Sequence, residues 1–536
     1  MSREVLPNRK KRITFFLAVA LLVLLTSFVL ERRRVAVPTH GTWLSGRKHY
    51  NALQVTTAEI ADIRQPVPRD ILILSQQKRV LGRAESFDEL FRTEEDVLPL
   101  IRRALQQPSV QADVKTFAAE LKMRNAEFMN YWERLQEADL YLESGGNPDA
   151  ISPAGACGVA QWMPGPGKKM GLRIDIDKSL AFTLQISMLN QEAARLISLI
   201  KQAPTSTTPQ QNQDASHLLQ TILSRIKSLQ KQRAKVDDRF NPQIAIFAQT
   251  RYLLALWHKL PDASWLFQAY HGGEAGAERT IKRWMGKKYT GTAAAAIRGG
   301  YGGNPLDFET VYLTSTPTLH PRAFEYLYSR GDDHRHYWWK ILCAATAFEA
   351  LHNHPTGIRV MYGLLLPGAP PPAIWYGTDP RGFRNLKDIQ ESLAAGELVP
   401  IRAEESIQIS IPPVNTAEQA SPMLSSLTPE AAACLKAVAR QYRLAGGKER
   451  LLVCQMCQTE QQQAVYGPLT LDFHRIGVAF DLRVPQDKHS KRLLDYTLGV
   501  LEDRMLIFRH LDKARGCWAV SPNPAFTGLT AASMHP

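Results

Sequence analysis

The stretch on which the interpretation of this chain depends runs from Glu143 to Pro164 and reads ESGGNPDAISPAGACGVAQWMP. The preceding residues, Val114 to Leu142, carry apolar side chains at the three- and four-residue spacing of an amphipathic helix. The glycines and prolines of the quoted stretch predict turns and loops instead. Glu143 therefore stands where a helix gives way to an irregular loop. Partial burial at such a place favours the protonated carboxyl group that a general acid needs.

A single glutamate before a glycine-rich loop also fits a solvated helix end with no chemical role. The whole stretch is more specific, because it resembles the signature of the soluble lytic transglycosylases, which have the goose-type lysozyme fold. In that family Glu-Ser is followed by Asn-Pro-x-Ala-x-Ser and then by Gly-Ala-x-Gly-x-x-Gln-x-Met-Pro, and all three elements stand here in order. Two later segments, Asp238 to Pro242 and Gln268 to Gly276, extend the resemblance to about residues 115–290.

The resemblance implies an enzyme that cleaves the glycan strands of peptidoglycan, with Glu143 as the sole catalytic carboxylate. Glu143 would protonate the oxygen of the β-1,4 bond between N-acetylmuramic acid and N-acetylglucosamine. As a carboxylate it would then take the proton of the muramic acid C6 hydroxyl, which closes onto C1 and leaves a 1,6-anhydro end. Most glycosidases use two carboxylates. Here the substrate would supply its own nucleophile, so no metal or organic cofactor is expected.

The resemblance also implies which residues bind the sugar chain: Ser144, Gly158, Gln161, Met163, Tyr270 and His271. Ser144 would position Glu143 or the substrate, and Tyr270 would hydrogen-bond near Glu143 across the cleft. His271 departs from the family, which has asparagine there, and would alter contacts to an N-acetyl group or the tuning of Glu143. Trp162 is either a packing residue or a platform on which a sugar stacks.

The N-terminus carries an apolar run, Ile13 to Leu30, between the basic residues 9–12 and 32–34. Its length just spans a hydrocarbon core of roughly 30 Å. A cleaved signal peptide would have a shorter apolar core that ends in small residues, so we expect an uncleaved signal anchor. The basic residues on both sides give only a modest bias toward a cytoplasmic N-terminus. This interpretation places the protein in the bacterial inner membrane, with its catalytic domain in the periplasm.

The net charge of +14 indicates acidic partners: nucleic acid, anionic lipid or a carboxylate-rich wall polymer. The sequence has no zinc-finger spacing, no ribonucleoprotein-type aromatic motif and no arginine-rich arm beyond the N-terminus, so we expect no nucleic-acid partner. Six cysteines in 536 residues are too few for a scaffold built on disulfides. We expect buried or singly paired cysteines, including Cys454 and Cys457 of the lone CxxC.

A second motif lies near the C-terminus, where residues 473–482 resemble the His-x-x-Gly-x-Ala-x-Asp metal segment of zinc D-alanyl-D-alanine carboxypeptidases. A catalytic zinc there needs three protein ligands and a glutamate base. His474 and Asp481 are candidate ligands, but Ala519 stands where the family has its later histidine, and no glutamate lies just upstream. We therefore expect a degenerate domain that binds wall peptides or only supports the fold. In that case His474 and Asp481 hydrogen-bond each other.

These observations predict a mostly α, lysozyme-like (α+β) catalytic domain, a smaller α+β peptidase-like domain and an N-terminal transmembrane helix. The parts are a cytoplasmic tip and anchor (1–34), a stalk and lead-in (35–113), the lysozyme-like domain (114–350), a linker region with strands (351–426) and the peptidase-like domain (427–536). A helical hairpin inserted at 184–230 would wall the groove, dock an envelope protein partner or serve as structure only.

Local patterns predict three further elements: a strand at Ile71 to Leu74, a helix over Pro242 to Leu260, and a helix over Ala431 to Tyr442 that begins at Thr428-Pro429-Glu430. For the function, three classes stay open. They are a lytic transglycosylase or a muramidase on the same fold, a non-catalytic peptidoglycan-binding scaffold, and a bifunctional glycan-cleaving enzyme and zinc peptidase. The combination of Glu143, Ser144 and Gln161 favours the first class.

Overall fold

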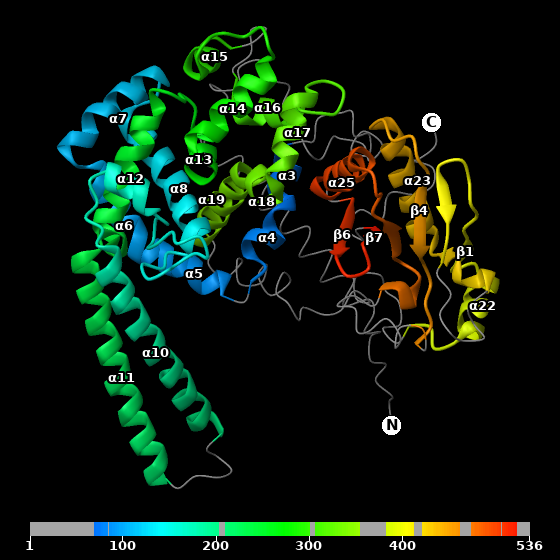
Figure 1. Ribbon diagram of the computed structural model, residues 1–536, viewed down its shortest axis with the longest axis horizontal. Coiled ribbons are helices and arrows are strands. Elements are labelled where there is room, and N and C mark those ends of the chain that lie inside the picture. Colours follow the sequence, from blue (N-terminus) through cyan, green and yellow to red (C-terminus); the bar gives the residue numbers. More distant parts are fainter. Residues whose placement is uncertain are drawn as a thin grey trace, which may run out of the picture. The chain divides into compact units, whose positions relative to one another are not determined.

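The computed structural model describes residues 69–83, 85–202, 209–300, 306–353, 382–411, 421–460, 462, 473–504 and 506–522. They belong to one compact unit and are mostly helical, with a small sheet in the C-terminal part (Figure 1). The coarse fold prediction is therefore confirmed. Among these residues, no helix combines the length and the apolar character needed to cross a membrane. The predicted anchor at residues 13–30 and the predicted stalk up to residue 68 lie outside the described residues.

Helices make up the described chain as far as Asn353 (Figure 1). In chain order they are α3 (Arg69–Ser75), α4 (Gln77–Leu81), α5 (Ser86–Arg92), the π-helix η2 (Thr93–Val97), α6 (Leu98–Leu105), α7 (Pro108–Glu120), α8 (Asn125–Ser144), α9 (Pro164–Lys169), α10 (Ile176–Gln202), α11 (Pro209–Val236), the 3-10 helix η4 (Asp238–Phe240), α12 (Pro242–Trp257), α13 (Ala263–Gly272), α14 (Glu274–Met285), α15 (Ala293–Gly299), α16 (Phe308–Thr314), α17 (Pro321–Ser329), α18 (Gly331–Arg335) and α19 (Tyr337–Asn353).

Helix α8 lies at the centre of this helical part, because α6, α7 and α19 all pack against it. The prediction of one continuous helix over residues 114–142 is wrong: α7 and α8 are separate helices. The chain turns between them at Lys122, whose φ of 55° lies in the left-handed region that ends regular helices. Helix α8 itself ends at Gly145, which adopts a φ of 60° and donates its amide hydrogen to the carbonyl of Tyr141.

The residues before α8 belong to the packed helices rather than to a lead-in. The strand predicted at Ile71 to Leu74 is wrong, since these residues lie in α3, where Leu72 is fully buried. A short apolar run fits a strand and a buried helix equally well, and here the contact of α3 with α19 determines the outcome. Helix α6 also packs against α12. The boundary predicted at residue 114 therefore falls inside the helical core.

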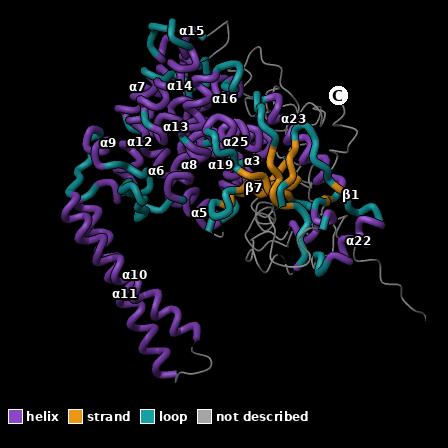
Figure 2. Tube along the Cα trace, turned by 45° about the vertical axis from the view of Figure 1, so that its right-hand side comes forward, coloured by secondary structure: helices purple, strands orange, loops and turns teal. Residues whose placement is uncertain are grey.

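The predicted helical hairpin is present and is longer than residues 184–230. Helices α10 and α11 lie antiparallel and side by side (Figure 2). A shared apolar seam joins them, formed by Ile186, Ala193, Leu196, Ile222, Ile226 and Leu229. At the base of the hairpin, the buried Arg233 of α11 forms an ion pair with Asp149 in the loop after α8. The residues 203–208 at its tip lie outside the described residues.

The C-terminal part combines strands with a few helices. They are α22 (Leu386–Ala394), β1 (Val399–Pro400), β2 (Ile407–Ile409), η5 (Pro422–Leu424), β3 (Ser426–Leu427), α23 (Pro429–Leu444), β4 (Leu451–Gln455), η6 (Phe473–Ile476), β5 (Phe480–Arg483), α25 (Lys488–Asp503), β6 (Ile507–Asp512) and β7 (Cys517–Pro522). The larger sheet has the order β2-β4-β5-β7-β6, in which only β2 and β4 run parallel. Strands β1 and β3 form a separate antiparallel pair.

The strands predicted between residues 351 and 426 are confirmed, but they do not form a linker. Strand β1 pairs with β3 and β2 pairs with β4, so residues 399–409 belong to the C-terminal fold. The proline-rich segments within 354–381 and 412–420 lie outside the described residues. The two remaining predicted helices are confirmed as α12 and α23. Thr428 caps α23, because its hydroxyl accepts the amide hydrogen of Ala431.

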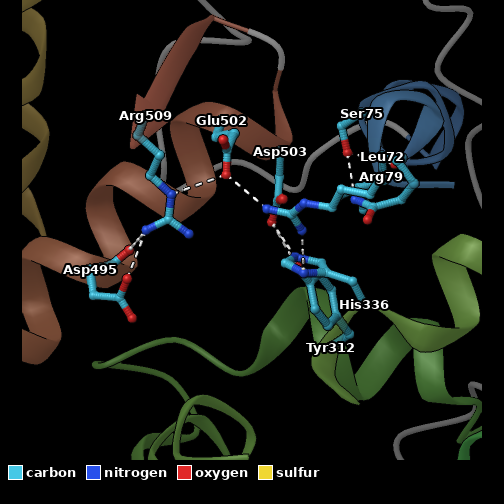
Figure 3. A network of polar contacts seen from close by, with 10 residues as sticks. Leu72, Ser75, Arg79, Tyr312, His336, Asp495, Glu502, Asp503 and Arg509 are labelled. Carbon is cyan, nitrogen blue, oxygen red and sulfur yellow. Dashed lines mark hydrogen bonds and ion pairs between the residues drawn. The ribbon is translucent and has the colours of Figure 1, made fainter. Parts of the chain in front are cut away.

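A buried polar network joins the helical part to the C-terminal part (Figure 3). Arg79 of α4 donates to Nδ1 of His336 (2.9 Å) and forms an ion pair with Glu502 of α25 (2.9 Å). Since arginine only donates, Nδ1 of His336 accepts and its Nε2–H donates to Asp503 at the end of α25 (3.0 Å). The hydroxyl of Tyr312 donates to the same Asp503 oxygen (2.8 Å). Burial lowers the pKa of His336, in keeping with a neutral ring.

Candidate functional site

Glu143 occupies the last turn of α8, where the sequence predicted it, and the glycine-rich loop follows directly. Its side chain is 14 % exposed. Two side chains from other helices contact one of its carboxylate oxygens, Oε1. The Tyr337 hydroxyl at the start of α19 lies 2.7 Å away, and Nδ1 of His271 in α13 lies 3.2 Å away. The carboxylate is thus held at a place that solvent still reaches.

A second carboxyl group lies behind the first. The Tyr337 hydroxyl also lies 2.8 Å from Oδ1 of Asp139, one helical turn before Glu143 on α8. Asp139 is fully buried, and its other oxygen accepts a hydrogen bond from the Gln249 amide of α12 (2.8 Å). Burial, together with the charge of Glu143, raises the pKa of Asp139 well above its ordinary value. The site therefore contains two carboxyl groups in different environments.

His271 connects the site to charged groups at its rim. Its ring stacks on that of Tyr337 at a centroid distance of 3.9 Å, and its Nε2 lies 3.4 Å from the exposed carboxylate of Asp333 in α18. Asp333 is also paired with Lys340. Burial alone would lower the pKa of His271, but the hydrogen bonds to Asp333 and Glu143 outweigh it and raise that pKa to about 9. An imidazolium ion at this position favours the ionised form of the carboxyl group beside it.

The loop after α8 is fixed by hydrogen bonds from predicted site residues. The Ser144 hydroxyl donates to the carbonyl of Val159 (2.8 Å), and the Gln161 amide donates to that of Gly158 (2.8 Å). Gly158 has a φ of 77°, and a Cβ on it would lie 1.7 Å from the backbone oxygen of Arg239. Its small size is thus required by packing. These three residues hold the loop against α8 and η4, which brings it beside Glu143.

The remaining predicted contacts divide into packing and exposed residues. Trp162 is buried and donates its indole N–H to the carbonyl of Ala245 (3.1 Å), so packing, not sugar stacking, accounts for it. Met163 is 41 % exposed at the start of α9. The hydroxyl of Tyr270 donates to the carbonyl of Ala160, in the loop that adjoins Glu143.

The structure therefore brings His271 to Glu143, and Ser144, Gln161 and Tyr270 to the adjoining loop. Sequence reasoning missed Asp139, Tyr337 and Asp333. Asp139 could have been found, since a residue four positions before Glu143 must share its helix face. Tyr337 and Asp333 carry no such signal, because they lie in a segment notable only for its aromatic content and reach the site through tertiary packing.

The C-terminal motif forms a different kind of cluster. Nε2 of His474 lies 3.0 Å from Oδ1 of Asp481, so the predicted contact between them is confirmed. The other Asp481 oxygen pairs with the Arg515 guanidinium (3.0 Å), which also donates to the Gln455 side chain. Ala519 lies directly opposite Asp481 in the β5–β7 ladder, on the same face of the sheet.

These residues do not fit a catalytic zinc. The position opposite Asp481, where a histidine ligand would stand, carries a methyl group, and a guanidinium cation already contacts the carboxylate. His510 lies opposite Ala519 on β6, two strands and roughly 10 Å from Asp481. Within the described part of the chain, no three His, Cys, Asp or Glu side chains are grouped so as to hold a metal ion. All six cysteines are buried and none forms a disulfide, while Sγ of Cys454 lies 3.1 Å from Sγ of Cys517.

We compared the chain with protein-family models, with curated proteins and with solved structures, and found no match in any of the three comparisons. The resemblance to lytic transglycosylases therefore rests on the sequence motifs alone.

Proposed function

We propose that this protein is a peptidoglycan lytic transglycosylase, which cleaves the β-1,4 bond between N-acetylmuramic acid and N-acetylglucosamine and leaves 1,6-anhydro ends. The observation that carries the proposal is the setting of Glu143. Its carboxylate is mostly buried, two side chains hold one oxygen, and no described residue hydrogen-bonds the other, Oε2. A fixed, partly exposed carboxyl group of this kind suits a general acid and base.

In this mechanism Glu143 acts twice. As an acid it protonates the glycosidic oxygen, which lets the bond to C1 of the muramic acid break. As a carboxylate it then removes the proton of the C6 hydroxyl, whose oxygen attacks C1. The glycine-rich loop, held by Ser144 and Gln161, lines the adjoining surface so that the sugar chain lies close to the carboxyl group. No metal or organic cofactor takes part.

The same proposal covers location and partners. The apolar run at residues 13–30 anchors the chain in the bacterial inner membrane, and the catalytic part faces the periplasm, where its substrate lies. The net charge of +14 suits a wall polymer rich in carboxylates. The hairpin of α10 and α11 exposes Leu180, Leu184 and Met188 along one helix, which suits contact with another envelope protein.

The test uses the full-length protein, purified in detergent, on isolated sacculi. The wild type should release muropeptides with 1,6-anhydro ends, and Glu143→Gln should release none. Glu133→Gln is the matched control, since Glu133 lies on the same helix and forms an ion pair with Arg102 away from the site (2.9 Å). Reducing ends would instead identify a muramidase. If Glu143→Gln is as active as the wild type, the proposal fails.

A further inference from the structure

We propose that Asp139 is a second functional carboxyl group, which holds a proton in the resting site and delivers it to Glu143 through the hydroxyl of Tyr337. This inference rests on the proposed role of Glu143 as acid and base. Asp139 contacts Tyr337 and no substrate, so it is a positioning and proton-holding residue. The resemblance to lytic transglycosylases gives no reason to expect it.

The spacing of Asp139 and Glu143 along α8 determines how the two carboxyl groups influence each other. Asp139 and Glu143 are four residues apart on α8 and so lie on one face, one turn apart. Two like charges at this spacing destabilise each other, and burial adds a cost for the ion that water cannot reach. Asp139 is fully buried, whereas Glu143 retains some exposure. The pair therefore favours a state in which only one of the two is ionised.

The Tyr337 hydroxyl contacts both carboxyl groups, and the hydrogens available for these two contacts decide whether one carboxyl group is protonated. The Tyr337 hydroxyl lies 2.7 Å from Glu143 Oε1 and 2.8 Å from Asp139 Oδ1, and both distances are those of hydrogen bonds. A hydroxyl has one hydrogen, which can make a short, nearly linear bond to only one of the two oxygens, whereas both contacts have the length of such a bond. The other contact needs a hydrogen from the carboxyl group itself. One of the two carboxyl groups is therefore protonated.

A chain of side-chain hydrogen bonds that ends at Asp139 decides which of its oxygens can carry the proton. The indole N–H of Trp132 can only donate, and it donates to Oε1 of Gln136 (3.0 Å). The Gln136 amide then donates to the oxygen of Gln249 (2.9 Å), and the Gln249 amide donates to Oδ2 of Asp139 (2.8 Å). These bonds fix which end of each glutamine amide is the nitrogen and which is the oxygen. Asp139 Oδ2 therefore accepts a hydrogen bond. A proton on Asp139 must sit on Oδ1, facing Tyr337.

The groups around the pair decide which of the two carboxyl groups carries the proton. Glu143 Oε1 also faces the His271 ring of α13, which is paired in turn with Asp333, and a cation there stabilises the Glu143 carboxylate. Asp139 faces the neutral Gln249 of α12, Tyr337 of α19 and, from α13, the Tyr270 ring. The resting arrangement is therefore Asp139–OH to Tyr337–OH to Glu143–O⁻. Burial and the two carboxyl groups raise the pKa of Tyr337, which keeps its own proton.

One proton moves from Asp139 to Glu143 and is later returned. Asp139 gives its proton to the Tyr337 oxygen, Tyr337 gives its own hydrogen to Glu143 Oε1, and Tyr337 ends unchanged. Rotation of the protonated carboxyl group about its Cγ–Cδ bond turns this hydrogen from Tyr337 toward the substrate, and Glu143 then protonates the glycosidic oxygen. When Glu143 later takes the proton of the C6 hydroxyl, the same path returns one proton to Asp139. Asp139 thus supplies the proton that Glu143, ionised in the resting arrangement, needs before it can act as an acid.

The first test needs no activity and uses the full-length protein without substrate. The infrared spectrum of the wild type minus that of Asp139→Asn should show the C=O stretch of a protonated carboxyl group at neutral pH, in addition to any band from Glu137, whose pKa burial raises to about 8. The same difference band should appear between Glu143→Gln and the double variant Asp139→Asn, Glu143→Gln. Absence of the difference band in the wild type would overturn the inference. This outcome is separate from the proposed function, which depends only on whether Glu143→Gln abolishes cleavage.

The second test is the pH profile of kcat on sacculi. Asp139→Asn and Tyr337→Phe should each lower kcat about 10- to 100-fold with KM unchanged. Each should also move the alkaline limb to lower pH, because Glu143 then has no high-pKa donor behind it. The double variant should be no worse than the poorer single one. Tyr252→Phe, which removes a hydroxyl beside Trp162, is the control. A merely structural role would lower the melting temperature and leave the alkaline limb in place, and that result would overturn the relay.

Discussion

The helical part and the C-terminal part each hold a buried carboxylate against a histidine, and the two clusters differ in what is left free. Around Glu143 the histidine and a tyrosine share one oxygen, and the side chain is 14 % exposed. Around Asp481 the histidine takes one oxygen and Arg515 the other, and the side chain is 3 % exposed. A carboxylate with both oxygens occupied stabilises a fold, whereas one with a free oxygen can exchange protons with a ligand.

The strongest way to break this comparison is to neutralise each carboxylate in turn. Glu143→Gln should lower the rate of glycan cleavage by about 100-fold or more, with little change in stability. Asp481→Asn should leave the rate unchanged and lower the free energy of unfolding by about 1–3 kcal/mol, because the asparagine amide offers one oxygen where the carboxylate offered two, so that either His474 or Arg515 loses its acceptor. Muropeptide release and urea denaturation of both variants provide the check. If Asp481→Asn instead abolished cleavage and Glu143→Gln only lowered stability, the chemistry would belong to the C-terminal part.

The second prediction concerns how the loop beside Glu143 is held. Gly158→Ala should cost about 3 kcal/mol or more, since its Cβ would meet the Arg239 backbone oxygen in addition to the strain of a positive φ. Gly155→Ala is the control in the same loop: its φ of 85° carries strain of about 1–2 kcal/mol, but no atom lies within 4 Å of the added Cβ. Equal losses in urea denaturation would contradict the packing role of Gly158.

The third prediction concerns pH. His271 has its pKa raised to about 9, above the ordinary value of 6.5, so its ion pairs stabilise the fold fully below pH 6.5 and lose this effect as pH rises through about 9. The wild type should exceed His271→Asn in stability by about 1–2 kcal/mol at pH 6, because water screens the exposed Asp333. By pH 10 the pH-dependent part of this difference should vanish, and only the loss of the ring stacked on Tyr337 should remain. Denaturation at both pH values, with the exposed His217→Asn as control, measures it.

The smallest expected effect is none at all. Because the residues around Asp481 do not fit a zinc ion, adding zinc or EDTA should leave the melting temperature of the full-length protein unchanged. The double variant Arg515→Ala, Ala519→His restores the missing ligand and removes the competing cation, so it should gain zinc binding and a zinc-dependent melting temperature. Stoichiometric zinc in the wild-type protein, lost in Asp481→Asn, would contradict this prediction.

The sequence predicted the parts of the site that are local along the chain. Helical periodicity placed Glu143 at a helix end, and the motif identified His271 and the loop residues. The His474–Asp481 contact followed from the resemblance of residues 473–482 to the metal segment of the zinc peptidases. Tyr337 and Arg515 could not be predicted in this way, because their roles depend on which helices and strands pack together. The same reason explains the wrong strand at Ile71 to Leu74, where the neighbours of the segment, not its composition, decide its form.

The network around His336 has a consequence for how the protein can be divided. His336 immediately precedes Tyr337, and helix α25 supplies the carboxylates for His336 and Arg79 (Figure 3). Shortening the chain after residue 353 would leave the Arg79 guanidinium and the buried, neutral His336 ring without these hydrogen-bond acceptors, at a cost of about 1–3 kcal/mol. The C-terminal part thus holds the start of α19 in place, and with it the Tyr337 hydroxyl that contacts Glu143.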